Sequence, residues 1–126
     1  MKRQHLSIAL ALCLAGCASL YARTAKTQTI TAEQARNHVG ETATVCGRVA
    51  STHYAPRSRG RATFLNLDHP YPHQVFTVVI WGTKRARFGR PEEQYRNKNI
   101  CVTGFISVYH GQPDMTLRSP KQIKVK

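Results

Sequence analysis

The sequence predicts a small all-β domain, a five-stranded β-barrel with one or two short helices. From Thr42 onward, apolar and polar residues alternate along several short segments, which is the period of a half-buried strand. Glycine and proline residues separate these segments. The length of 126 residues allows one domain of ordinary size. A barrel suits such a chain because closing a sheet leaves no exposed edge strand.

The N-terminus has the features of an export signal. Lys2 and Arg3 precede an apolar run, Leu6 to Leu14, which is shorter than the roughly 20 residues needed to span a bilayer. The sequence Leu-Ala-Gly-Cys that ends at Cys17 resembles a bacterial lipobox. The resemblance implies that residues 1–16 are a lipoprotein signal peptide and that Cys17 is acylated. Since Ala18 is not Asp, it also implies the periplasmic side of the outer membrane.

Two alternative localisations stay open. The same segment fits an ordinary signal peptide cut after Ala22, which would discard Cys17 and give a soluble periplasmic or secreted protein. A cytoplasmic protein is the third possibility. In the lipoprotein interpretation residues 17–30, which are polar and irregular, form a tether between lipid and domain.

The folded domain is expected over residues 31–126, beginning with a helix. Thr31 with Gln34 three residues later is a capping-box pattern, and Gly40 is a natural helix end. These signals predict a helix over Ala32 to Val39. A second short helix is expected from Pro91, where proline is followed by two glutamates.

Period-two patterns predict the strands. The first begins at Thr42, and Gly47 within it suggests a bulge or a bend. A basic loop, His53 to Gly60, follows. The remaining strands are expected at Arg61 to Asp68, Gln74 to Trp81, Asn99 to Tyr109 and Asp114 to Arg118, and residues 122–125 extend an edge. Leu65, Leu67, Ile106 and Val108 are expected to point inward.

The resulting order, β-β-β-α-β-β, is that of the OB-fold, a five-stranded Greek-key barrel. The segments VCGRV, TFLNLD, YPHQVFTVVIW and ICVTGFISVYHGQPDMTLRSPKQI resemble the strands of small bacterial OB-fold domains of the nucleic-acid-binding, tRNA-anticodon-like type. The resemblance covers about residues 31 to 125. It implies the barrel, and more weakly a nucleic-acid ligand, because other OB-folds bind oligosaccharides or proteins.

The domain contains two of the four cysteines, Cys46 and Cys101. In the OB-fold order their strands are antiparallel neighbours, so a disulfide between them is expected, as suits an oxidising compartment. Two separate buried thiols are the alternative. The sequence contains no CxxC motif of the kind that binds zinc.

The chain is strongly basic. It carries 19 Lys and Arg against 6 Asp and Glu, a formal net charge of +13. A charge of this size favours polyanionic partners: nucleic acid, lipopolysaccharide or an acidic membrane surface.

Two basic clusters and a few exposed side chains are the candidate ligand contacts. Arg57, Arg59 and Arg61 lie in the loop that flanks the groove of an OB-fold, and Lys84, Arg85 and Arg87 follow the third strand. Phe64 and Asn66 face outward, and Trp81 is either a stacking platform or a plug at the barrel end. The candidate nucleic-acid-binding residues are therefore Arg48, Arg57, Arg59, Arg61, Phe64, Asn66, Trp81, Lys84, Arg85 and Arg87. The alternative is that the basic loops are merely solvated.

Other aromatic residues are given structural roles. Phe105 and Tyr109 are expected to cover a helix or the back face of the barrel, and Tyr71 to brace a proline turn. No catalytic motif is found, and no cofactor or metal site is predicted. We therefore expect an exported binding module for single-stranded nucleic acid and not an enzyme. The alternative is an envelope adaptor that binds an acidic protein or another polyanion such as lipopolysaccharide.

Overall fold

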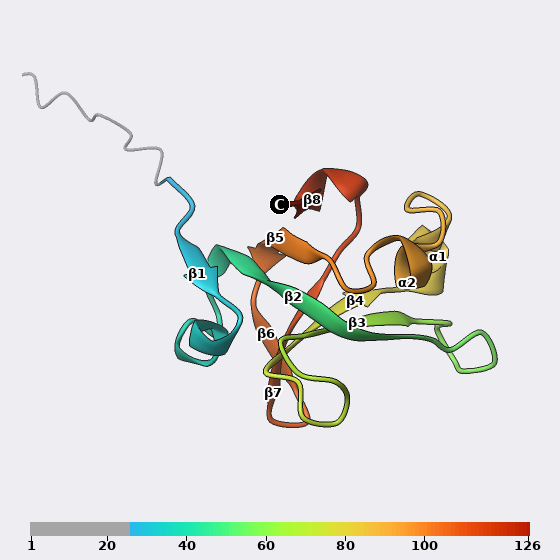
Figure 1. Cartoon of the computed structure of the whole chain (residues 1–126), viewed down its shortest axis with the longest axis horizontal. Helices are drawn as coiled ribbons and strands as arrows, with labels where there is room; N and C mark the ends of the chain where they lie inside the picture. The colour runs from blue at the N-terminus through green and yellow to red at the C-terminus, as the bar shows by residue number, and fades with distance from the viewer. Residues whose placement is uncertain (1–25) are drawn as a thin grey trace, which may run out of the picture.

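The computed structural model describes residues 26–126 (Figure 1). The expected signal peptide, Cys17 and most of the expected tether fall on residues 1–25 and lie outside the described part. Among the described residues, no helix has the length and apolarity to cross a membrane.

Strands dominate the domain. Its elements in chain order are β1 (Thr29–Thr31), the 3-10 helix η1 (Glu33–Asn37), β2 (Thr42–Tyr54), β3 (Thr63–Leu67), β4 (Phe76–Ile80), α1 (Gly82–Arg85), α2 (Pro91–Gln94), β5 (Asn99–Phe105), β6 (Ser107–Tyr109), β7 (Gln112–Thr116), the 3-10 helix η2 (Pro120–Gln122) and β8 (Ile123–Val125).

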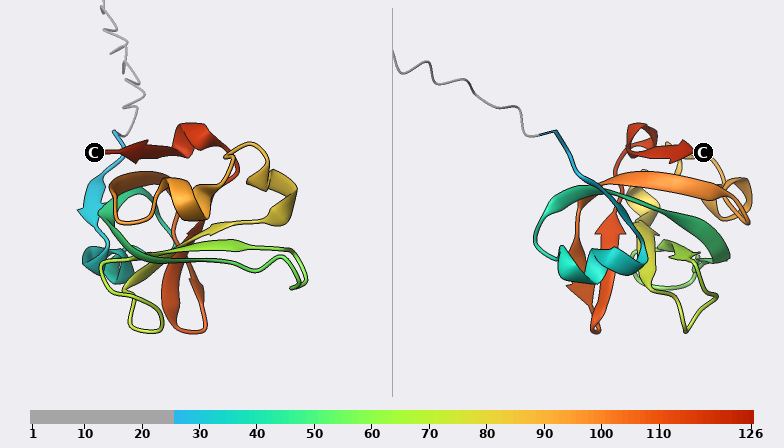
Figure 2. Two further views of the ribbon diagram at one scale, coloured as in Figure 1. Left: turned by 45° about the vertical axis from the view of Figure 1, so that its right-hand side comes forward. Right: turned by 60° about the vertical axis from the view of Figure 1, so that its left-hand side comes forward.

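The strands form one coiled sheet in the order β6-β7-β4-β3-β2-β5-β8, with β1 paired to β2 (Figure 2). Neighbours are antiparallel except for the parallel pairs β4–β7 and β1–β2. The long strand β2 takes part in both halves, since it pairs with β5 through Thr42–Arg48 and with β3 through Val49–Tyr54. This is the predicted Greek-key arrangement, but the hydrogen-bonded path has two free ends and is not a closed barrel.

The hydrogen-bonded path is interrupted within the segment Asn99 to Tyr109, which the sequence predicted as one continuous strand. Ile106 separates β5 from β6. Its N–H donates to Glu41 O at 2.9 Å, and its carbonyl accepts from Gly40 N at 2.8 Å. Ile106 therefore pairs with the turn before β2 and not with a neighbouring strand. This break also corrects one side-chain assignment, because Val108 is 48% exposed and not inward.

The core lies inside the coiled sheet. Leu65 and Leu67 of β3 point into it with no exposed surface, as predicted, and Val78 and Phe76 of β4 lie directly opposite them in the register. The other fully buried large side chains are Val45, Val49, Ile80, Ile100, Val102, Ile106, Met115 and Leu117. Tyr95, the residue after α2, is also buried, and this burial raises the pKa of its phenol above the usual value.

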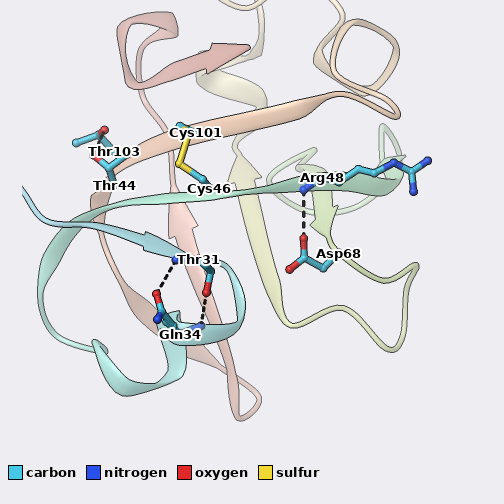
Figure 3. Close-up of a disulfide and its surroundings, with 8 residues drawn as sticks. All are labelled: Thr31, Gln34, Thr44, Cys46, Arg48, Asp68, Cys101 and Thr103. Carbon is cyan, nitrogen blue, oxygen red and sulfur yellow. Dashed lines mark hydrogen bonds between the residues drawn. A yellow bond between two sulfur atoms is a disulfide. The ribbon is translucent and has the colours of Figure 1, made fainter. Parts of the chain in front are cut away.

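The N-terminal segment joins the fold two residues earlier than expected. Residues Thr29 and Ile30 belong to β1, and Ile30 is 4% exposed, so the end of the expected tether is part of the sheet. The capping box is present: Thr31 N donates to Gln34 Oε1 at 2.9 Å and Gln34 N to Thr31 Oγ1 at 3.2 Å (Figure 3). In place of the predicted helix over Ala32 to Val39, the structure has the shorter 3-10 helix η1, in which Ala35 is the buried residue.

Cys46 and Cys101 are directly opposite in the β2–β5 register and form a disulfide (Figure 3), as predicted. The next outward-facing pair in this register is Thr44 and Thr103, whose hydroxyls are 2.7 Å apart. The first and fourth strands of the predicted five-strand barrel are thus cross-linked covalently.

Strand β2 contains a register shift, but not at the glycine. The shift falls between Val49 and Ser51. Gly47 instead permits a close approach, because a Cβ there would lie 2.8 Å from Asp68 Oδ1 and 3.1 Å from Ala32 Cβ. The same Asp68 oxygen accepts from Arg48 N at 3.2 Å (Figure 3).

Candidate nucleic-acid interface

An open cavity of about 750 Å³ lies on the outer face of the sheet, over β2, β3, β4, β6 and β7. Its lining residues are Ser51, Thr52, His53, Phe64, Asn66, Tyr71, Pro72, Gln74, Thr77, Val79, Tyr109, His110, Gln112 and Asp114.

Strand alternation produces this face. Leu65 and Leu67 enter the core, so Phe64 and Asn66 point to the opposite side. The register sets Phe64 between His53 of β2 and Val79 of β4. In the next outward row, Asn66 lies between Ser51 and Thr77, and Thr77 is opposite Asp114 of β7.

Two connections frame the cavity. Tyr71, Pro72 and Gln74 come from the loop that follows β3, and His110 from the turn between β6 and β7. Both connections extend to the same side of the molecule in Figures 1 and 2. The sheet forms the base of the cavity between them.

The rim of the cavity is exposed and aromatic. Tyr71 is 73% exposed and Tyr109 is 68% exposed. The rings of His53 and Phe64 are nearly parallel, with centroids 6.4 Å apart, and Tyr109 meets His110 edge to face at 4.1 Å. Aromatic rings held at the mouth of a cavity are suitable surfaces for stacking a planar ligand.

The floor is polar and buried. Tyr71 N and Asn66 Nδ2 each donate to Ser51 Oγ at 3.0 Å. Thr77 Oγ1 donates to Asn66 Oδ1 at 3.4 Å and accepts from Gln74 Nε2 at 3.2 Å. These bonds connect β2, β3 and β4 to the loop after β3, so the loop is held over the sheet in a defined position.

Of the predicted contact residues, Phe64 and Asn66 line the cavity. The basic residues and Trp81 do not. Arg57, Arg59 and Arg61 are exposed on the connection between β2 and β3, residues 55–62, which we call the basic hairpin. The hairpin extends away from the body of the domain in Figure 1. Because His53 and Phe64 lie one residue pair before its base, the hairpin begins where the cavity ends.

The two predicted basic clusters do meet. Gly82 N donates to Gly60 O at 2.9 Å, which joins the start of α1 to the basic hairpin. Trp81, 44% exposed, lies against Gly60, where an added Cβ would be 3.0 Å from its ring. Trp81 therefore connects the clusters and is not enclosed within the barrel.

Three of the basic candidates have protein partners. Arg85 forms an ion pair with Glu92 and lies over the ring of Tyr54, 3.8 Å from its centroid. Arg87 donates to Arg118 O at 3.3 Å. Arg48 donates to Asn97 Oδ1 at 3.4 Å. The partly buried Arg85 has a structural role at the junction of β2 and α2.

Several cavity residues were assigned to other roles in the sequence. Tyr71 and Tyr109 were expected to brace a turn and to cover the back of the barrel, but both are exposed at the cavity. His53 was placed in a loop, yet β2 extends to Tyr54 and carries it into the sheet. The alternation of the segment Ser51 to Tyr54 continues that of β2, and this was the signal that could have found His53.

Comparisons with known proteins identify the fold and no family. No family model matches the chain, and no curated protein matches it. Among solved structures, an OBody, AM1L10, bound to hen egg-white lysozyme is 18% identical with a TM-score of 0.55, over 80% of this chain and 95% of the OBody.

Two synthetases from Entamoeba histolytica also match. The asparaginyl-tRNA synthetase is 18% identical with a TM-score of 0.49 over 81% of this chain, and the aspartyl tRNA synthetase is 17% identical with a TM-score of 0.46 over 82%. The chain spans only 24% and 22% of the two synthetases. Together with the strand order, the likeness to the OBody confirms the predicted OB-fold.

Proposed function

We propose that this domain is a binding module, not an enzyme, and that it binds single-stranded nucleic acid. Bases stack at the cavity, and phosphates contact the basic hairpin. The observation that carries the proposal is the continuity of the two surfaces: the His53–Phe64 pair at the cavity rim lies one residue pair before residues 55–62, which carry the arginines.

The chemistry of the basic hairpin and of the cavity determines which part of the ligand each one binds. Guanidinium groups offer a planar fork of donors that suits phosphate and remains charged. None of the residues that line the cavity is Lys or Arg, so its aromatic rim suits bases better than phosphates. An OB-fold commonly uses this face and the adjoining loops for oligonucleotides.

We also propose that the protein acts outside the cytoplasm, anchored through Cys17. The Cys46–Cys101 disulfide supports an oxidising compartment, and the lipobox-like sequence at the N-terminus supports the anchor.

The test is fluorescence anisotropy with the purified protein and a labelled single-stranded oligonucleotide over a salt series. The logarithm of affinity should fall with that of salt, by a slope of about −0.7 per phosphate contacted. Replacing Arg57, Arg59 and Arg61 by Ala should weaken binding and reduce the size of the slope by about 2, because roughly three phosphate contacts are lost.

A matched variant controls for net charge. Lys121, Lys124 and Lys126 are exposed on and beside β8 and do not line the cavity, so their replacement by Ala removes the same charge elsewhere. That variant should keep most of the slope. Equal effects of the two variants, or heparin competing as well as the oligonucleotide at equal charge, would favour a general polyanion adaptor over the proposed function.

A further inference from the structure

Gln74 places an amide at the floor of the cavity. It lies at the end of the loop after β3, lines the cavity, and is only 8% exposed. Buried amides ordinarily use both their oxygen and their nitrogen in hydrogen bonds. Within the described residues, only the nitrogen of the Gln74 amide has a hydrogen-bond partner.

The hydrogen-bond chain on the floor determines which amide atom is used. Thr77 Oγ1 gives its proton to Asn66 Oδ1, so it can only accept from Gln74. Gln74 meets it with Nε2 at 3.2 Å. Gln74 Oε1 is then a buried acceptor without a hydrogen-bond partner within residues 26–126. Leaving such an acceptor unpaired is unfavourable, so a ligand that supplies a donor gains affinity there.

The required donor must project from its ligand. Gln74 is recessed below a rim formed by exposed rings such as Tyr71 and Tyr109. An exocyclic amino group extends beyond the edge of a base, as in cytosine, adenine and guanine. The ring N–H of uracil or thymine is flanked by two carbonyl oxygens, which would approach the glutamine oxygen with like partial charge.

We propose that the cavity selects nucleobases carrying an exocyclic amino group, and that Gln74 Oε1 accepts a hydrogen bond from that group. This inference rests on the proposed function, since it names the base class that the same cavity takes. Gln74 determines specificity, whereas the basic hairpin supplies contacts that are independent of base identity.

The experiment compares oligonucleotides that differ in the amino group. Anisotropy is measured for 12-mers of deoxycytidine against deoxyuridine, and of deoxyadenosine against purine deoxyriboside, which lacks only the amine. The protein should bind the amino-bearing member of each pair about three- to tenfold more tightly, the effect expected of one neutral hydrogen bond. The salt slope should be the same for both members.

Gln74→Met should abolish this preference while leaving the salt slope unchanged. Gln94→Met is the matched control, because Gln94 is exposed and does not line this cavity; it should keep the preference. Circular dichroism checks that both variants are folded, and Gln74→Glu, which retains an acceptor, should preserve the order within each pair if the methionine variant is unfolded.

The outcomes separate this inference from the proposed function. Tight, salt-dependent binding with equal affinity within each pair would overturn the role of Gln74 and leave nucleic-acid binding intact. So would a preference that survives in Gln74→Met. Failure of every oligonucleotide to bind at low salt would overturn both.

Discussion

Phe64 is the residue at which the cavity and the basic hairpin meet. Its ring is half-buried, faces out of the sheet beside His53, and lines the cavity. Phe64→Ala should weaken oligonucleotide binding by about 1–3 kcal/mol, the usual contribution of one base–aromatic stack. The salt slope should not change because no charge is removed. Anisotropy at several salt concentrations measures both quantities.

Phe105 provides the comparison for that variant. It is 57% exposed at the end of β5 and does not line the cavity. Phe105→Ala should leave affinity within about twofold of the unaltered protein, since a surface substitution away from the site changes little. If both alanine variants lost affinity equally, stacking at the cavity would be the wrong explanation.

At the scale of the element, the packing of strand β2 requires glycine at position 47. The backbone of Gly47 is packed so closely against Asp68, Ala32 and Leu67 that an added Cβ meets an atom at 2.8 Å. Gly47→Ala should lower the free energy of unfolding by about 1–3 kcal/mol, as overpacking does. Urea denaturation measures the change.

A double variant identifies the cause of that loss. The nearest atom is Asp68 Oδ1, which belongs to a side chain and not to the backbone. In an Asp68→Ala background, Gly47→Ala should therefore cost less than it does alone. An equal cost in both backgrounds would instead assign the loss to Ala32 and Leu67.

The elements that the sequence predicted well are those specified by local pattern. The alternation around Leu65 and Leu67 fixes which side of β3 enters the core, and the Thr31–Gln34 box fixes the start of η1. The interruption at Ile106 was not predictable in this way, because its cause is a pair of hydrogen bonds with the distant turn at Gly40–Glu41. Tertiary pairing outweighs a continuous β pattern there.

The site was predicted in part for the same reason. Phe64 and Asn66 follow from the alternation of one strand. Tyr71, Gln74 and Tyr109 reach the cavity through a loop and a turn, whose directions no local pattern specifies. The charge of the arginines indicated a polyanionic ligand. It did not indicate how far they lie from the cavity, because side chains a few residues apart along a hairpin can belong to different surfaces.

At the scale of the whole molecule, the basic side chains and the cavity occupy different parts of the surface. The chain has a formal charge of +13, yet no Lys or Arg is among the residues that line the cavity. Long-range attraction would therefore bring any polyanion to the domain, whereas only a ligand with planar, hydrogen-bonding groups would use the cavity. This separation is the reason that salt dependence and base dependence are expected to respond to different variants.

The Cys46–Cys101 disulfide is expected to affect stability far more than binding. The cysteines are 55 residues apart in sequence, and a cross-link that closes a loop of this size contributes about 4 kcal/mol in the chain-entropy model. Replacing both cysteines by Ala should lower the free energy of unfolding by about 2–4 kcal/mol, measured by urea denaturation. Dithiothreitol should have a similar effect on the unaltered protein and none on the variant.

Binding should survive this change because the bond and the cavity depend on different contacts. The disulfide joins β2 to β5 in the half of β2 that pairs with β5 and not with β3. The cavity floor is held instead by ladders among β3, β4 and β7 and by the Ser51–Asn66–Thr77 hydrogen bonds. At a temperature where the double variant remains folded, its affinity for a single-stranded oligonucleotide should stay within about twofold of the unaltered protein, since distant sites contribute nearly independently. A large loss of affinity with the fold intact would mean that the covalent link also sets the position of the strands that carry the cavity.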